Sequence, residues 1–437
     1  MVRRTWVLGG LIGVAAVAFA SAAGSSGDTS AKSVTTPPQT NETSVAGTIP
    51  VITVPSATVP STTVPATTTT STPATTTSLA PTTTTTSTVA PTTTATATTE
   101  DFRPFNAAAF DAVIASATVD VGDVSAGTAV VRNGEVLHAA AFGLENPLEG
   151  KTATAVTRFR LGSVSKMLTS VAVMQLVNEG ALELDEPFAS QLGRKGPFVD
   201  PRIATITVRQ LLSHMSGFNV SRNLYFGHGV DTWQQAAENA LGQTLQSDPG
   251  TAFRYSNTNF CILGLLIEHV TGEPFERAVR DRVLQPIGIS AHLAPTFDTE
   301  AGDAVQASSP GRNYMEALGP AGGWVATPTD VAKLAAALRD DATTAGLDKE
   351  TVDSMRVRVL VPVEFPPPAN GWSYGLGLML FGDGSWGHTG TIESTHAVVV
   401  NRPDGLTVSI LANGKRPLNT DDLLPVIDLA VAAAFAA

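Results

Sequence analysis

Cysteine is almost absent from this sequence, and positive charge is scarce. The single cysteine is Cys261, so no intrachain disulfide can form and stability must come from packing. Lysine and arginine number 27 against 39 acidic residues, giving a formal net charge of -12, and the basic residues form no cluster. This balance argues against nucleic acid and against an anionic membrane surface as partners.

Charged residues are missing altogether between Glu42 and Glu100. From residue 24 to residue 100 the chain consists mainly of Thr, Ser, Pro and Ala, without the periodic apolar residues that would offset the entropy of ordering. We interpret residues 24–100 as a disordered Thr/Ser/Pro-rich stalk, which acts as a spacer rather than as a domain.

Residues 1–23 have the pattern of a signal peptide. Arg3 and Arg4 precede an apolar run that reaches Ala20-Ser21-Ala22, an A-x-A pattern that suits signal peptidase. The alternative is an uncleaved membrane anchor, because the apolar run is only slightly shorter than a bilayer-spanning helix. In both cases we expect the rest of the chain to be extracytoplasmic, secreted or in a bacterial cell envelope. Contact with a membrane is expected only if this segment is retained.

Residues 101–437 form the folded domain in this interpretation, and strands are expected at both of its ends. Near its start, two apolar segments flank Asn133-Gly134, a dipeptide typical of a β-hairpin turn. Near its end, a second hairpin is expected around the turn at residues 403–405. The expected strands are residues 126–131, 135–141, 374–380, 397–401 and 406–411.

Between these strands the pattern is helical, with apolar periodicity that ends at glycine or begins near an acidic residue. The expected helices are residues 166–179, 208–213, 260–270, 328–339 and 421–436. The sequence therefore predicts an α/β (α+β) fold, with one antiparallel sheet formed from both chain ends and flanked by helices. A mostly helical domain is inserted from the middle of the chain, and active sites favour the seam between two such parts.

Ser163 and Lys166 form the first motif whose residue types could take part in catalysis. If Ser163 opens the helix that follows, a spacing of three places both side chains on one helix face. A desolvated lysine can remove the proton from a serine hydroxyl, and the N–H groups of a helix start favour developing negative charge. Taken alone, the motif fits a polar helix start with a solvated lysine better, because two fixed positions recur by chance. The long apolar helix behind it argues that the pair is held against a core.

The second motif is Tyr255-Ser256-Asn257. A tyrosine beside a lysine can have its phenol pKa lowered and carry a proton between nucleophile and leaving group. Asn257 offers both a donor and an acceptor to a substrate amide. Without the other motifs, this segment would be interpreted as a surface turn rich in Ser and Asn.

The third motif, His388-Thr389-Gly390, begins a predicted strand. Glycine at that position would let a substrate backbone approach the strand edge, where His388 and Thr389 can donate to a carboxylate or carbonyl. Alone this motif has almost no predictive value. All three motifs in this order, in an exported domain, indicate an acyl-transfer enzyme.

In this combination the chain resembles the serine β-lactamase and penicillin-binding protein superfamily, in its branch of class C β-lactamases and D-alanyl-D-alanine carboxypeptidases. That family's signature is S-x-x-K, then Y-S/A-N, then K/H-T-G. The likeness covers most of residues 126–413. Residues 206–217 resemble the family's segment ITVRxLLSHTSG, and Gly322-Gly323-Trp324 with the following Thr327 resembles its glycine pair before a helix.

The resemblance implies roles for individual residues. Ser163 would be acylated, with Lys166 and Tyr255 carrying the proton, and the backbone N–H groups of Ser163 and Thr391 would form the oxyanion hole. The implied substrate-binding residues are Asn257, His388, Thr389, Gly390 and Thr391, with His388 and Thr389 facing a substrate carboxylate. His388 stands where class C β-lactamases carry lysine. A neutral imidazole binds a carboxylate less strongly than an ammonium group does, so the choice of substrate stays open.

The function expected from this resemblance is an exported serine hydrolase, a D-alanyl-D-alanine carboxypeptidase acting on cell-wall peptides and therefore on peptidoglycan. A β-lactamase or an esterase of the same fold is the enzymatic alternative, and a non-catalytic wall-binding module is the alternative of another class. Neither a cofactor nor a metal is expected. Histidines without metal-ligand spacing are His214, His228, His269, His292 and His396. The G-x-G-x-x-G pattern at residues 382–387 lacks the strand–loop–helix unit of a dinucleotide site.

Overall fold

A computed structural model describes residues 104–121, 123–219, 231–294, 299–305, 315–339, 343–359, 372–414 and 420–436. The predicted signal peptide at residues 1–23 and the predicted stalk at residues 24–100 lie outside these ranges and stay predictions. Over the described ranges, no helix has both the length and the apolar character needed to cross a bilayer.

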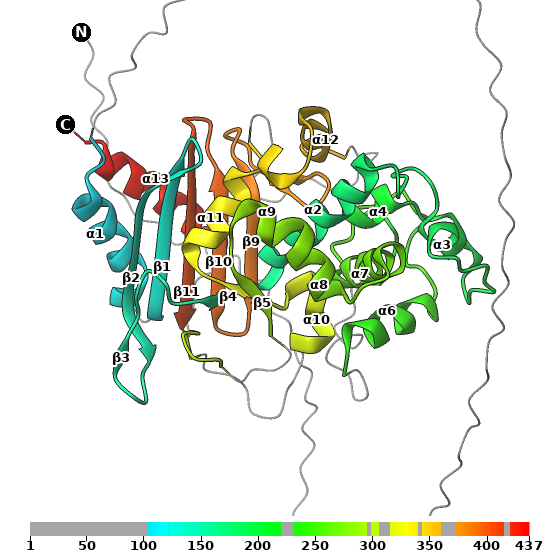
Figure 1. Ribbon diagram of the computed structural model, residues 1–437, viewed down its shortest axis with the longest axis horizontal. Coiled ribbons are helices and arrows are strands. Elements are labelled where there is room, and N and C mark those ends of the chain that lie inside the picture. The colour runs from blue at the N-terminus through cyan, green and yellow to red at the C-terminus, as the bar shows by residue number, and fades with distance from the viewer. Residues whose placement is uncertain are drawn as a thin grey trace, which may run out of the picture. The chain divides into compact units, whose positions relative to one another are not determined.

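Strands from both ends of the folded part lie side by side in one antiparallel sheet (Figure 1). Its members are β1 (Asp123–Arg132), β2 (Glu135–Asn146), β3 (Lys151–Thr152), β7 (Ser373–Tyr374), β8 (Met379–Leu380), β9 (Trp386–Ile392), β10 (Thr395–Asn401) and β11 (Leu406–Gly414). The spatial order is β3-β2-β1-β11-β10-β9-β8-β7, so β1 pairs with β11 along its whole length. The predicted sheet, formed from both chain ends, is confirmed. A second, three-stranded sheet that was not predicted contains β4 (Phe159–Arg160), β6 (Trp324–Ala326) and β5 (Ala291–Leu293).

The prediction of one strand over residues 374–380 is wrong. β7 and β8 are two short strands that pair with each other, because the chain reverses between them. Gly377 has φ +75° at this reversal, a left-handed conformation that other residues adopt with strain. The segment was predicted as one strand, whereas the glycines within it mark a turn.

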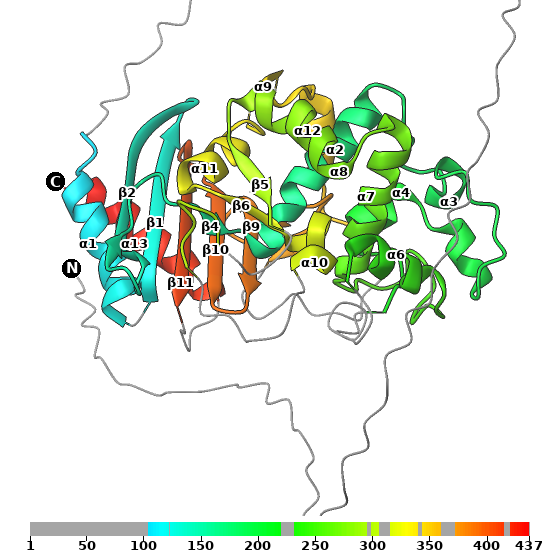
Figure 2. The same cartoon turned by 60° about the horizontal axis from the view of Figure 1, so that its bottom comes forward.

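Helices cover both faces of the sheet (Figures 1 and 2). α1 (Ala107–Ala117) and α13 (Leu423–Ala434) pack with Val130 of β1 into one apolar cluster. α11 (Pro328–Ala336) packs on the opposite face, where it contacts the neighbouring residue Val131 through Ala332. This alternation follows from the two-residue period of a strand. The predicted terminal helix is confirmed, whereas α1 was not predicted.

The middle of the chain forms the predicted helical domain, shown beyond β9 in Figures 1 and 2. Its helices are α2 (Ser165–Asn178), α3 (Phe188–Gln191), α4 (Val208–Leu212), α6 (Trp233–Leu241), α7 (Asn257–Thr271), α8 (Phe275–Val279), α9 (Gln285–Ile287), α10 (Met315–Gly322) and α12 (Lys349–Met355). α2 is buried continuously from Ser165 to Leu176 and forms the centre of this part. Cys261 of α7 is buried.

Replacing a buried side chain of α13 should destabilise the fold. Ile427 is 1% exposed in the cluster between α13 and the sheet. Ile427→Ala should lower the free energy of unfolding by about 2–4 kcal/mol, because it removes apolar contacts and leaves a cavity. Urea denaturation followed by circular dichroism measures this change. The matched control is Leu429→Ala on the same helix, where the side chain is 63% exposed. Equal destabilisation by both variants would contradict the packing of α13 described here.

Candidate active site

The three sequence motifs meet where the edge of the sheet adjoins the helical domain. Ser163 lies in the 3-10 turn η2 (Gly162–Val164), directly before α2, and therefore does not itself open the α-helix as predicted. Lys166 lies in the first turn of α2, and Asn257 is the first residue of α7. The third motif lies within β9, the strand next to the helical domain in Figure 2.

Lys166 is fully buried, and three oxygens surround its amine. Its Nζ donates to Oδ1 of Asn257 at 2.7 Å and to the backbone oxygen of Ala321 at 2.7 Å. The Oγ of Ser163 lies 3.0 Å from the same Nζ. The structure therefore brings Ser163, Lys166 and Asn257 together within hydrogen-bonding distance.

The partners of Lys166 determine where its lone pair points. The oxygens of Asn257 and Ala321 can only accept, so they take two N–H groups of the amine. In the neutral amine the remaining position is a lone pair, and Ser163 Oγ lies there. Burial lowers the pKa of Lys166 to about 7, so a large share of the amine is neutral near that pH. Lys166 is thus arranged to accept the proton of Ser163.

Tyr255 supplies the third titratable group of the site. Its phenol is hydrogen bonded to Ser163, and Lys166 Nζ lies 4.9 Å from the centroid of its ring. The prediction of a lowered phenol pKa is wrong. Burial raises the pKa of Tyr255 well above its usual value, and the hydrogen bond to Ser163 opposes this shift only in part. A neutral phenol can act as a general acid and a neutral amine as a general base, so Tyr255 and Lys166 suit these two roles.

Gly390 brings β9 into close contact with the turn that carries Ser163. A Cβ atom at this position would lie 2.2 Å from the oxygen of Leu161 and 2.9 Å from the nitrogen of Ser163. Only glycine fits there without a shift of the backbone. The predicted function of this glycine was to admit a substrate backbone, but the contact that requires it is with the protein's own turn.

The backbone N–H of Thr391 points toward the same turn. The N–H of Thr389 donates to Sδ of Met379 on β8, which lies on the side of β9 away from β10. Because N–H groups two residues apart in a strand point the same way, the N–H of Thr391 also points away from β10. A Cβ on Gly162 would lie 3.1 Å from the nitrogen of Thr391. The two nitrogens of the predicted oxyanion hole therefore lie on facing segments.

His388 has a different orientation from the one predicted. Its imidazole is 1% exposed, and its Nε2 lies 2.8 Å from the hydroxyl of Tyr374. Its Nδ1 lies against the carbonyl oxygen of Thr389, which can only accept, so the ring proton is on Nδ1 and Tyr374 donates to Nε2. Burial and the nearby Lys166 lower the pKa of His388 to about 3. His388 is thus a neutral, inward-facing group. Thr389 is half-buried, and its hydroxyl donates to the weak acceptor Sδ of Met379.

His214 holds the segment around Tyr255, and the sequence analysis did not assign it this part. Its carbonyl accepts from the N–H of Arg254 at 2.8 Å, and its Nδ1 accepts from the N–H of Ser256 at 3.2 Å. Its ring lies on the ring of Tyr255, with centroids 4.2 Å apart. His214 adopts φ +58°, an uncommon conformation for a residue other than glycine, which lets both of its groups reach one segment. The signal that could have indicated this was its place in residues 206–217.

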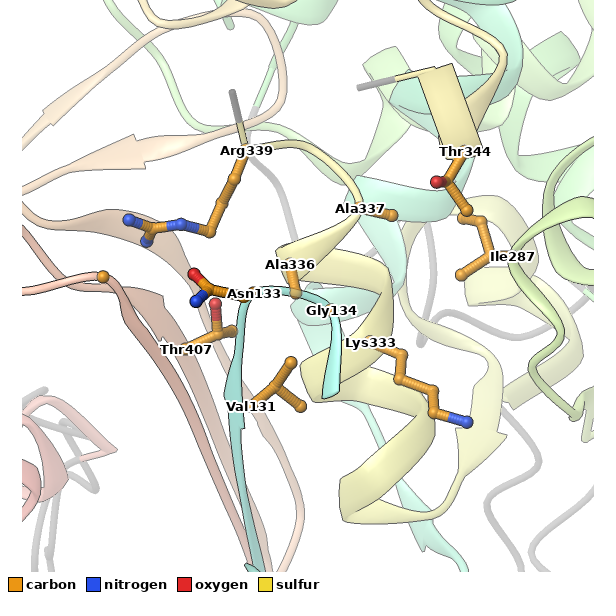
Figure 3. Close-up of a pocket in the computed structure, with 11 residues that line it drawn as sticks. Val131, Asn133, Gly134, Ile287, Lys333, Ala336, Ala337, Arg339, Thr344 and Thr407 are labelled. Carbon is orange, nitrogen blue, oxygen red and sulfur yellow. The ribbon is translucent and has the colours of Figure 1, made fainter. Parts of the chain in front are cut away.

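A cavity of about 430 Å³ lies between the β1–β2 turn and the end of α11 (Figure 3). Asn133 and Gly134 of the turn, Lys333 of α11 and Thr407 of β11 line it. None of the predicted site residues lines this cavity, so we assign it no part in the chemistry at Ser163. In the described part of the chain, no group of three or more His, Cys, Asp or Glu side chains could hold a metal ion.

The fold and this arrangement of Ser163, Lys166 and Tyr255 define a serine hydrolase of the β-lactamase fold. A family model described as Beta-lactamase matches residues 110–433. The chain therefore belongs to the β-lactamase family, as the sequence motifs indicated. The match does not distinguish the class C branch, which stays a prediction.

Similar proteins include penicillin-binding proteins and esterases. Penicillin-binding protein 4 of Amycolatopsis lactamdurans is 29% identical over 299 residues, which cover 64% of this chain and 78% of that protein. Esterase EstB of Burkholderia gladioli is 28% identical over 361 residues, which cover 70% of this chain and 90% of that protein. The crystal structure of SurE with D-Leu has a TM-score of 0.58 and 30% identity, covering 76% of this chain and 75% of that one. Several other curated relatives match over only about two fifths of their own length.

The pKa of Lys166 predicts the pH dependence of acylation at Ser163. Because the neutral amine is the base, the acylation rate should rise with pH through an apparent pKa near 7 and then level off. Stopped-flow acylation by a chromogenic ester measures this profile. Lys166→Arg, whose guanidinium keeps its proton, should lose the rise and react about 10²–10⁴ times more slowly. Lys333→Arg is the matched control. A flat profile in the unmodified protein would refute the role of Lys166 as the base.

Removing Nδ1 of His214, which accepts from the N–H of Ser256, should slow ester hydrolysis without unfolding the protein. His214→Phe keeps an aromatic ring beside Tyr255 but leaves the N–H of Ser256 without its partner. The expected loss in kcat is about tenfold to a hundredfold, because Tyr255 loses its exact placement. Steady-state kinetics with the same ester measure it. The control is His138→Phe, which replaces a histidine of β2 that pairs with Asp111 of α1. Wild-type kcat in folded His214→Phe would contradict the proposed support of Tyr255.

Proposed function

We propose that this protein is an exported D-alanyl-D-alanine carboxypeptidase, which cleaves the terminal D-alanine from cell-wall peptides through an acyl-Ser163 intermediate. The proposed acyl-serine chemistry rests on one observation: Oγ of Ser163 lies 3.0 Å from the buried amine of Lys166. The other partners of that amine are acceptors only, so its lone pair is directed at the serine proton. The fold alone would not supply this argument, since one fold can carry many functions.

In the acylation step, Lys166 takes the proton of Ser163 while Oγ attacks the carbonyl carbon of the scissile peptide bond. The electrons of the carbonyl move onto its oxygen, which the N–H groups of Ser163 and Thr391 would stabilise. Collapse of this tetrahedral intermediate releases D-alanine as its amine takes a proton from the phenol of Tyr255. Tyr255 recovers a proton from Lys166, whose amine is again neutral. Water then attacks the ester carbonyl and releases Ser163.

The choice of a D-residue substrate is supported by two of the similar proteins. The name of penicillin-binding protein 4 indicates binding of penicillin, and the SurE crystal structure contains D-Leu. Both proteins cover more than three fifths of this chain. A site that accepts a D-residue would suit the D-alanyl-D-alanine ends of peptidoglycan. The predicted signal peptide and stalk support this location, because a spacer lets the catalytic domain reach a substrate in the cell wall.

Ester hydrolysis is a second candidate, and the state of His388 favours it. A carboxypeptidase substrate ends in a carboxylate, whereas the imidazole of His388 is buried, neutral and turned toward Tyr374. An ester without a carboxylate needs no cation at this position. Esterase EstB, which matches over most of its length, supports the same alternative.

The experiment that separates these functions compares three substrates on the purified protein. A labelled penicillin, a peptide ending in D-alanyl-D-alanine and a simple aryl ester are each incubated with wild-type protein and with Ser163→Ala. We expect release of D-alanine from the peptide and a covalent penicillin adduct at Ser163. Both should fall at least about a thousandfold in Ser163→Ala, because this substitution removes the nucleophile. Mass spectrometry of the adduct and an assay of free D-alanine give the two measurements.

Each outcome assigns one function. Hydrolysis of the ester without release of D-alanine would select the esterase, and rapid turnover of penicillin would select a β-lactamase. Undiminished labelling of Ser163→Ala would remove Ser163 from its role. If no substrate acylates the folded protein, the catalytic proposal fails, and binding to isolated peptidoglycan then tests the wall-binding alternative.

A further inference from the structure

Thr420 contacts the strand edge of the candidate site from a distant part of the chain. It lies in the 3-10 turn η6 (Thr420–Asp422), just before α13, and its side chain is 2% exposed. Its hydroxyl is hydrogen bonded to the hydroxyl of Thr391, and it lies 3.1 Å from Nδ1 of His396 and 3.4 Å from the carbonyl oxygen of Gly390. None of the sequence motifs includes Thr420.

Thr420 has one proton and two lone pairs to share among these three partners. The carbonyl oxygen of Gly390 can only accept, so this contact, the longest of the three at 3.4 Å, uses the proton of Thr420. In that arrangement the hydroxyl of Thr391 and Nδ1 of His396 donate to the oxygen of Thr420. Together the three contacts hold the buried hydroxyl in place.

Gly390 and Thr391 share the peptide bond that carries the second nitrogen of the predicted oxyanion hole. In a trans peptide, the carbonyl of Gly390 and the N–H of Thr391 point in opposite directions. The carbonyl of Gly390 therefore points toward β10, where Gly390 pairs with Ala397, so the sheet sets the direction of this peptide. Thr420 adds a second donor to the same carbonyl, at 3.4 Å, and so reinforces that direction. The same hydrogen bond polarises the peptide group and makes its N–H a stronger donor. Thr420 also holds the side chain of Thr391, so it contacts both residues that flank this peptide bond.

We propose that Thr420 is a positioning residue for the oxyanion hole, which holds the Gly390–Thr391 peptide with its N–H directed at the substrate carbonyl oxygen. This inference rests on the proposed acyl-serine chemistry and adds a residue to it. Thr420 touches no substrate in this scheme. Its effect is confined to the step in which negative charge develops on the carbonyl oxygen, since the N–H of Thr391 gains most of its interaction energy there.

The test uses three substitutions at one position. Thr420→Val keeps the volume of the side chain and removes the hydroxyl, Thr420→Ala removes it and leaves space, and Thr420→Ser restores it. For an aryl ester, kcat and kcat/KM of Thr420→Val should fall together by about tenfold, less than the full loss of an oxyanion donor. Thr420→Ser should recover most of the activity. Thr128→Val is the matched control, because Thr128 is a buried threonine of the same sheet that donates to a backbone carbonyl, that of Ser409.

A thionoester substrate distinguishes an effect on the oxyanion hole from a general loss of structure, because a general loss would leave the ratio of ester rate to thionoester rate unchanged. Sulfur in place of the carbonyl oxygen accepts hydrogen bonds poorly, so the oxyanion hole contributes less to its hydrolysis. The ratio of ester rate to thionoester rate should therefore fall about tenfold in Thr420→Val and stay at the wild-type value in Thr128→Val. Thermal unfolding confirms that each variant is folded. If Thr420→Val does not fold, Thr420→Ala gives the same comparison.

The outcomes separate this inference from the proposed function. An unchanged ratio in folded Thr420→Val or Thr420→Ala, with wild-type protein still acylated at Ser163, would overturn the role of Thr420 alone. The same holds if Thr420→Ser is as slow as Thr420→Val. Absence of acylation of the wild-type protein by penicillin, peptide and ester alike would instead refute the acyl-serine chemistry itself.

Discussion

The chemistry of this protein depends on an amine that is buried among neutral groups. Lys166 is fully buried, and in the described part of the chain its hydrogen-bond partners are a side-chain amide, a backbone carbonyl and a serine hydroxyl. A carboxylate in place of Asn257 would stabilise the ammonium form and raise its pKa, whereas burial among neutral groups lowers it to about 7. A lysine at that pKa can both take and return a proton near neutral pH. The packing of α2 against α7 and α10 keeps water away from the amine.

The proposed oxyanion hole needs the two parts of the fold to approach each other closely. One of its two nitrogens would be that of Ser163 in the helical part, and the other that of Thr391 in the sheet. A glycine at position 390 allows the contact, since a Cβ would lie 2.2 Å from the oxygen of Leu161. The predicted seam is therefore a place of tight backbone contact, and its geometry depends on residues of both parts.

Contacts between residues close together in the sequence could be predicted, whereas contacts between distant residues could not be predicted from local pattern. Ser163 and Lys166 are three residues apart, so helical geometry alone brings them together once α2 forms. Tyr255 and Thr391 reach the site through tertiary folding. The second motif already indicated Tyr255 as a proton carrier, whereas only the resemblance to a family indicated Thr391. The pattern of strands and helices predicted the two-part fold because apolar periodicity is a local property. The reversal between β7 and β8 was missed because glycine allows a turn inside an otherwise apolar segment.

Other features depend on packing that no local pattern contains. The pairing of Tyr374 with His388 turns an expected surface donor into a buried neutral group. The phenol of Tyr255 was expected to have a lowered pKa because a lysine lies near it, but desolvation is the larger effect and raises that pKa. Sequence shows which groups approach each other, whereas the sign of a pKa shift depends on how much water remains around them.

The two buried histidines maintain the basicity of Lys166 by staying neutral. Burial lowers the pKa of His214 and of His388, and the nearby Lys166 lowers both further. This electrostatic effect is mutual, so a proton on either imidazole would make the amine of Lys166 harder to protonate. Because both imidazoles give up their protons first, Lys166 is free to take the one from Ser163. The neutral surrounding of Lys166 is thus what leaves its amine able to act as the base in the proposed reaction.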